Sequence, residues 1–219
     1  MNFNLKNHLK RSFWVLWILL MFFGVGLLLI VGNHEFSIFV NSWHNDILDF
    51  FFKNLTYLGD GIFLFLITFV FIFYKRKFGI LTLSSLSITT IIVQFLKRII
   101  FQNHLRPSMI FQDLIQDGSW NNIEGLNLYE KFSFPSGHTA LIFCFCVMLS
   151  LYIKRNNWSL FLISIAFLVG FSRIYLTQHF LLDVLVGALI GSLVALQTHT
   201  YFEKFISKID FLKIKDEKG

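Results

Sequence analysis

The sequence SRIYLTQHFLLD, residues 172–183, places an arginine, a histidine and an aspartate between two long apolar runs. No Lys, Arg, Asp or Glu interrupts the run 156–172 before it or the run 184–202 after it. A transmembrane helix needs about 20 predominantly apolar residues, so each run is about long enough to cross a membrane. The sequence therefore predicts a polar turn joining two membrane spans.

The bulk composition supports a membrane protein. Of 219 residues, 55% are hydrophobic, only 15% are charged and 29 are Phe, which is too apolar for a soluble globule. The net charge of +6 does not indicate nucleic-acid binding, because the basic residues form small clusters and no long stripe. Six windows are apolar enough to be spans, at about residues 13–31, 55–74, 78–96, 136–153, 158–175 and 180–198.

The distribution of Lys and Arg predicts the orientation of these spans. With six spans, one set of alternate loops holds 13 of the 19 basic residues and the other set holds six. Cytoplasmic loops carry the excess of basic residues. We therefore expect a cytoplasmic segment 1–12, a six-span domain 13–198 and a basic cytoplasmic tail 199–219, in the cytoplasmic (inner) membrane. The polar stretches between the spans then lie on the periplasmic or extracellular face.

The segment between the first two windows predicts an additional helix. Apolar residues recur at helical spacing from Phe36 to Phe51, and polar residues occupy much of the opposite face. Such a pattern is typical of an amphipathic helix lying in the membrane interface. The polar stretch 102–131 predicts a loop over the site. The expected fold is all-α, a six-helix transmembrane bundle with an interfacial helix and a periplasmic loop.

His179 and Asp183 lie four residues apart, on one face of a helix that begins the last span. A carboxylate in that position can bind one imidazole nitrogen and leave the other free to attack. A polar pair that merely caps the helix has the same spacing. Arg173 favours the chemical interpretation, because a guanidinium at membrane depth is suited to binding phosphate oxygens.

Two further stretches end other apolar runs on the same face. PSGH, residues 135–138, predicts a turn in which Ser136 caps the helix and His138 can act as a general acid. The stretch 97–107 begins with Lys97 and Arg98 and closes with Arg106 and a proline. Anionic headgroups could hold each basic cluster separately, but they explain the two histidines poorly.

The chain resembles the type 2 phosphatidic acid phosphatase family, which shares its site with vanadium haloperoxidases. Pro-Ser-Gly-His and Ser-Arg followed by His and Asp match that family's second and third signatures. The first signature has a lysine seven residues before Arg-Pro, a position held here by Ile99. By residue type we favour Lys97 for this role, reached through a small insertion near 102–104, with Arg98 as the alternative.

The resemblance implies a mechanism and a set of site residues. His179 is the nucleophile that forms a phosphohistidine, Asp183 orients it, and His138 protonates the leaving group and later activates water. It implies no metal and no cofactor. The residues implied to bind the phosphate are Lys97, Arg106, Ser136, Gly137 and Arg173.

The expected function is hydrolysis of a lipid phosphate or lipid diphosphate in the bilayer. Candidate substrates are undecaprenyl diphosphate, phosphatidylglycerol phosphate, phosphatidate and the phosphates of lipid A. The alternatives are a lipid phosphotransferase using the same site, a vanadate-dependent haloperoxidase and a non-catalytic membrane protein. The sequence indicates no nucleic acid and no obligate protein partner.

Overall fold

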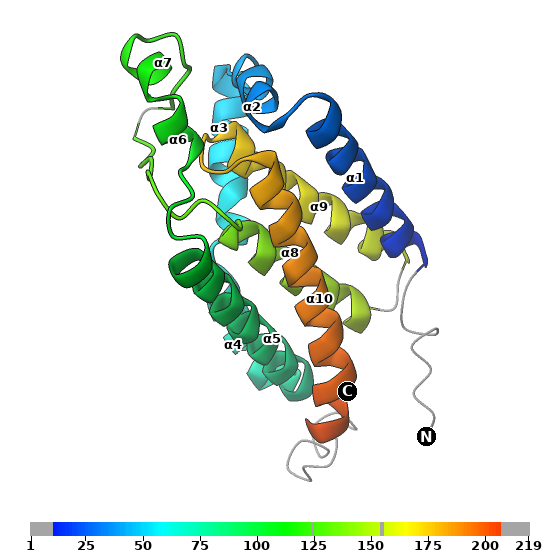
Figure 1. The fold of residues 1–219 in the computed structure, drawn as a ribbon. Helices are drawn as coiled ribbons and strands as arrows, with labels where there is room; N and C mark the ends of the chain where they lie inside the picture. The colour runs from blue at the N-terminus through cyan, green and yellow to red at the C-terminus, as the bar shows by residue number, and fades with distance from the viewer. Residues whose placement is uncertain (1–10, 124, 154–155, 207–219) are drawn as a thin grey trace.

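The computed structural model describes residues 11–123, 125–153 and 156–206, and over these residues the chain forms helices and loops without a strand. The long helices lie side by side in a bundle, and α6 and α7 project at one end (Figure 1). The bundle helices are α1 (Arg11–Ile30), α4 (Gly61–Tyr74), α5 (Arg76–Phe95), α8 (Gly137–Tyr152), α9 (Asn156–Tyr175) and α10 (Leu181–Ile206).

Five of the six predicted windows each fall on one of these helices, whereas the window 55–74 is divided by a bend and only its part from Gly61 lies in α4. Four helices are long and apolar enough to cross a membrane, at Ser12–Ile30, Arg76–Ile100, Trp158–Tyr175 and Leu181–Tyr201. A fifth candidate is the pair Asp46–Gly59 and Gly61–Tyr74, which is bent by 51°. Helix α8 has 16 residues and is shorter than these spans. Length and composition thus support four or five spans in the described part of the chain.

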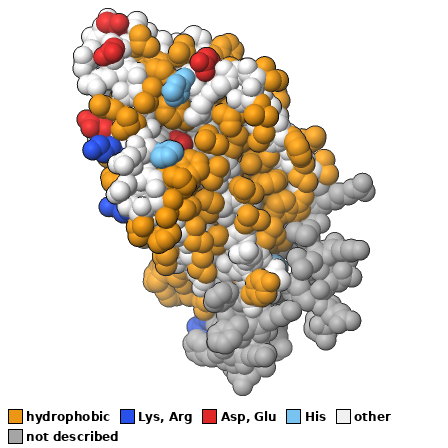
Figure 2. Space-filling model, in the orientation of Figure 1, with side chains coloured by type: hydrophobic (Ala, Val, Ile, Leu, Met, Phe, Trp, Pro, Cys, Tyr) orange, Lys and Arg blue, Asp and Glu red, His pale blue; other side chains and the backbone are white. Residues whose placement is uncertain are grey.

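The outer surface of the bundle is strongly apolar. Large hydrophobic side chains such as Phe22, Leu29 and Ile30 are exposed on α1. Figure 2 shows one face covered mainly by hydrophobic side chains, with acidic and histidine side chains toward the end that carries α6 and α7. Surfaces of this composition are favourable in lipid and costly in water.

Helix α8 forms the centre of the bundle, where it packs closely against α10. Eleven of its 16 residues are buried. A Cβ atom at Gly191 would lie 2.0 Å from the carbonyl oxygen of Ala140, and one at Gly187 would lie 2.6 Å from that of Ser136. Small residues permit this approach of two backbones. The contact places the start of α8 beside the start of α10.

The predicted interfacial helix is two helices, α2 (Asn33–Asn41) and α3 (Asp46–Leu55). The break occurs because the Asn45 side chain caps α3, accepting hydrogen bonds from the backbone N–H groups of Ile47 and Leu48 at 3.2 and 3.0 Å. The predicted apolar face is also divided. Val40 is fully buried, whereas the Ile47 side chain is 80% exposed. Local capping thus overrides the continuous helical spacing seen in the sequence.

The loop predicted over the site contains the short helices α6 (Pro107–Ile110) and α7 (Gln112–Gln116). Phe111 and Trp120 stack with their ring centroids 4.4 Å apart, and Phe180 packs against the same cluster. The Trp120 indole N–H donates a hydrogen bond to the Thr177 hydroxyl at 3.1 Å. These contacts attach the loop to the connection between α9 and α10.

Candidate active site

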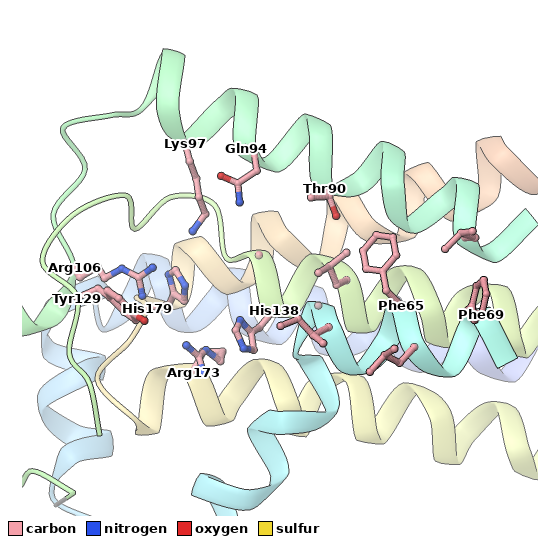
Figure 3. Close-up of a pocket in the computed structure, with 16 residues that line it drawn as sticks. Phe65, Phe69, Thr90, Gln94, Lys97, Arg106, Tyr129, His138, Arg173 and His179 are labelled. Carbon is pink, nitrogen blue, oxygen red and sulfur yellow. The ribbon is translucent and has the colours of Figure 1, made fainter. Parts of the chain in front are cut away.

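A cavity of about 750 Å³ lies between α4, α5, α8 and the connection from α9 to α10 (Figure 3). Its polar lining comes from all three predicted stretches and consists of Lys97, Arg106, Gly137, His138, Arg173 and His179, with Tyr129, Gln94 and Thr90. Its apolar lining consists of Ile62, Phe65, Leu66, Phe69, Leu83 and Leu141. The cavity therefore has a cationic end and an apolar end.

His179 is 2% exposed and is held from one side. Its Nδ1 lies 3.2 Å from Asp183 Oδ2, so the predicted contact forms, although His179 precedes α10 and is not part of the helix. The same carboxylate oxygen accepts hydrogen bonds from the Ser133 hydroxyl at 2.5 Å and from the backbone N–H of Phe180 at 3.0 Å. A proton assigned to Nδ1 satisfies the carboxylate and leaves Nε2 as the nitrogen available for attack.

The environment of His179 keeps its imidazole neutral. Burial lowers the pKa of His179 well below its ordinary value of 6.5, and the charges of Lys97, Arg106 and Arg173 lower that pKa further. A neutral imidazole has the lone pair that a nucleophile requires.

The Pro-Ser-Gly-His stretch begins helix α8 as predicted. The Ser136 hydroxyl accepts a hydrogen bond from the Thr139 hydroxyl at 2.8 Å and lies 3.5 Å from the Thr139 backbone nitrogen. The backbone N–H of Ser136 donates to the Asp183 carbonyl at 3.0 Å. Ser136 is buried behind the cavity, while Gly137 and His138 line it. These hydrogen bonds connect the segment that carries His138 to the segment that carries His179.

The two arginines reach the cavity from different segments. One Arg173 nitrogen, Nη1, donates to the Thr56 hydroxyl at 2.7 Å, and its buried Nε has no protein partner among the described residues. Arg106 Nη1 donates to the backbone and side-chain oxygens of Gln178, each at 3.0 Å. A buried donor without a partner beside a cationic cavity is suited to an anionic oxygen.

Lys97 and Arg98 point to different environments. Lys97 is 7% exposed, lines the cavity, and donates from Nζ to the carbonyl oxygen of Phe132 at 2.9 Å. Arg98 is exposed and donates to the side-chain oxygen of Gln94 at 3.0 Å. Both lie in a π-helical turn, η3 (Leu96–Ile100), which contains more residues per turn than an α-helix.

The polar residues at the site that were not found from the sequence are Thr90, Gln94 and Tyr129 in the cavity lining, and Ser133, Thr56 and Asp60 in contact with site residues. Ser133 binds Asp183, and only its position two residues before Pro135 could have identified it. Thr56 and Asp60 come from the bend before α4, where Asp60 Oδ2 lies 3.9 Å from His138 Nε2. No local signal marks either residue, because the bend reaches the site only through tertiary packing. Within the described ranges, no three His, Cys, Asp or Glu side chains are grouped to hold a metal ion.

Comparison with known proteins places this geometry in a family. The bacitracin transport permease protein BcrC of Bacillus licheniformis is 48% identical over 64 residues, which are 29% of this chain and only 30% of that protein. An undecaprenyl-diphosphatase of Sulfolobus acidocaldarius is 26% identical over 195 residues, covering 84% of this chain and 87% of that protein. The crystal structure of Aquifex aeolicus LpxE matches with a TM-score of 0.64 and 31% identity, covering 77% of this chain and 95% of that one.

The family match includes all three predicted stretches. The PAP2 superfamily matches residues 78–207, which contain Lys97, Arg106, His138 and His179. With several helices apolar enough to cross a membrane, the chain is a multi-pass membrane protein. It belongs to the PAP2 superfamily.

Proposed function

We propose that the protein hydrolyses a lipid phosphate or lipid diphosphate through a phosphohistidine on His179, without a metal ion. One observation carries the proposal. The free Nε2 side of His179 faces a cavity that also contains Lys97, Arg106 and Arg173, while Asp183 holds the other ring nitrogen. A nucleophile beside three phosphate-binding cations is the arrangement that phosphoryl transfer requires.

The protein is a phosphatase by its family, and its relative from Sulfolobus acidocaldarius is named for a prenyl diphosphate. The substrates that we propose are undecaprenyl diphosphate, phosphatidylglycerol phosphate, phosphatidate or a lipid A phosphate. The apolar end of the cavity supports a lipid, because Phe65, Phe69 and Leu66 offer no partner to a water-soluble phosphate ester.

The proposed reaction has two steps. His179 Nε2 attacks phosphorus, the bond from phosphorus to the leaving oxygen breaks, and His138 gives its proton to that oxygen. Asp183 stabilises the positive charge that develops on the His179 ring. His138 then takes a proton from water, the water oxygen bonds to phosphorus, and the bond from phosphorus to His179 breaks. Lys97, Arg106 and Arg173 stabilise the charge on the phosphoryl oxygens in both transition states.

We also propose six spans, with both termini in the cytoplasm and the site on the periplasmic or extracellular face of the cytoplasmic membrane. The start of α1 and the end of α10 lie away from the end that carries α6 and α7, which supports an even number of crossings (Figure 1). Exposed Ser119, in the loop after α7, offers a direct test. In intact cells an impermeant maleimide should label Ser119→Cys and not Lys77→Cys, whereas after lysis it should label both. The native Cys144 and Cys146 are buried.

The activity is tested with purified protein in detergent and excess EDTA. Prenyl diphosphate, phosphatidylglycerol phosphate, phosphatidate and lipid A are compared side by side, and released phosphate is measured. We expect turnover of at least one of them. No turnover of any lipid, or a loss of turnover in EDTA that only added metal restores, would contradict the proposal.

A further inference from the structure

The bend before α4 brings a carboxylate beside His138 that none of the three signatures contains. Helix η2 (Thr56–Gly59) ends at this bend, and Asp60 caps α4. Asp60 Oδ1 accepts a hydrogen bond from the backbone N–H of Phe63 at 3.2 Å. Its other oxygen, Oδ2, lies 3.9 Å from His138 Nε2, within ion-pair range. One oxygen thus holds the helix while the other faces the imidazole.

Packing fixes the position of this bend relative to α8 and α9. A Cβ atom at Gly59 would lie 2.7 Å from Val169 Cγ1 and 3.1 Å from the carbonyl oxygen of His138. The absence of a side chain at Gly59 lets the chain pass close to the backbone that carries His138 without displacing a neighbour. Three residues earlier, the Thr56 hydroxyl accepts a hydrogen bond from Arg173 at 2.7 Å. The bend therefore contacts two residues of the proposed machinery and is held in one place.

The charges around His138 make the position of Asp60 informative. Arg173 on α9, Lys97 on η3 and Arg106 in the outer loop share its cavity, together with the His179 imidazole. These cations disfavour protonation of His138 because they repel its positive charge, whereas a carboxylate within about 4 Å favours protonation. Asp183 is directed to His179, and Asp60 is the carboxylate directed to His138.

We propose that Asp60 is a positioning residue that pairs with protonated His138 and so holds the proton that this histidine gives to the leaving oxygen. The inference rests on the proposed function, because it assigns a partner to the general acid of that reaction. In the first step the proton leaves His138 for the lipid oxygen, and Asp60 remains a carboxylate. When His138 takes a proton from the attacking water, Asp60 stabilises the imidazolium again.

The test uses two substrates that differ in their need for an acid. A lipid phosphate releases a strongly basic alkoxide, whereas a nitrophenyl phosphate carrying an alkyl tail releases a phenolate that needs no proton. Asp60→Asn removes the charge and keeps a side chain that caps helices well. We expect kcat for the lipid phosphate to fall about 10- to 100-fold. The rate of the nitrophenolate burst, which reports the first step alone, should change less than about threefold.

Further variants separate this role from a structural one. Asp60→Glu should retain part of the lipid phosphate activity that Asp60→Asn loses. The alkaline limb of the pH profile of kcat for the lipid phosphate should lie at lower pH in Asp60→Asn than in the wild type. Asp60→Ser, which also caps helices, replaces Asp60→Asn if that variant does not fold. Asp113→Asn, an exposed carboxylate on α7, is the matched control and should behave as the wild type.

Two results would overturn the inference. An equal loss in kcat for the lipid phosphate and in the rate of the nitrophenolate burst would indicate a structural role, and unchanged kcat on the lipid phosphate would indicate no role. Both are read against wild-type turnover of the lipid phosphate. Failure of the wild type on every lipid phosphate contradicts the proposed function itself, so the two failures are distinguishable.

Discussion

The surroundings of the two histidines differ sharply although both line one cavity. His179 is enclosed, with Nδ1 bound to a carboxylate that Ser133 and the backbone also hold. His138 has a side chain 32% exposed, and the nearest carboxylate oxygen is 3.9 Å away. A nucleophile benefits from one fixed orientation and a dry environment, because a small misplacement greatly slows attack. A general acid must instead reach both a bulky leaving group and water, which requires an open position.

The largest effect should come from the enclosed histidine. His179→Ala removes the nucleophile, so we expect kcat to fall at least about 10⁴-fold on lipid and nitrophenyl substrates alike. The rate of phosphate release under single-turnover conditions measures this loss. Retention of more than about 1% of wild-type activity would show that another group attacks phosphorus.

Loss of the open histidine should have an effect that depends on the substrate. His138→Ala should lower kcat about 10²- to 10⁴-fold with a lipid phosphate. With a nitrophenyl ester, the first step needs no acid while the second still needs a base. We therefore expect phosphoenzyme to accumulate, visible as a burst of nitrophenolate. The absence of a burst, with equal losses on both substrates, would contradict the division of roles between the histidines.

The adjacent cations Lys97 and Arg98 provide a matched pair. Lys97→Met should lower kcat/KM about 10- to 100-fold, because it removes a charge that faces the phosphate in the transition state. Arg98→Met should change kcat/KM less than about threefold, since Arg98 is exposed and bonded to Gln94. The reverse order would assign the first-signature position to Arg98.

A smaller effect is expected for Ser133, which supports the enclosed histidine. Ser133→Ala removes one hydrogen bond to Asp183 and leaves the bonds from Phe180 and His179 in place. Hydrogen bonds to charged groups contribute about 1.5–3 kcal/mol. Because two other bonds still hold Asp183, we expect the lower end of this range, a loss of kcat of about tenfold. Ser133→Thr keeps the hydroxyl and serves as its comparison. Equal activity of Ser133→Ala and wild type would show that Asp183 is held without it.

The smallest expected effect is a difference in pH dependence. The lowered pKa of His179 keeps the nucleophile neutral at pH values below 6.5. Lys97 contributes to that lowering, so Lys97→Met should raise the pKa of His179. The ratio of kcat/KM for this variant to that of the wild type cancels the ionisation of the substrate. We expect this ratio to fall further between pH 7.5 and 5.5, and a constant ratio would contradict the electrostatic account.

Much of the site could be predicted from the sequence because its chemistry is local. His179 lies two residues before α10 and Asp183 lies in its first turn, so the pair is close in sequence, and Ser136 caps α8. The start of α4 at Gly61 and the break between α2 and α3 could not be predicted, because caps and packing decided them. Thr56 and Asp60 were missed for another reason. They are distant in sequence from the three stretches and contact Arg173 and His138 through the close packing of the bend at Gly59.

The most direct test of the central claim is to trap the intermediate on His179. The His138→Ala variant is mixed with a nitrophenyl phosphate labelled with ³²P, quenched within milliseconds in alkali and digested. The account predicts an acid-labile, alkali-stable label on the peptide that contains His179, and no label when His179 is also replaced by alanine. Label on another residue, or a burst of nitrophenolate without protein-bound phosphate, would contradict the phosphohistidine mechanism.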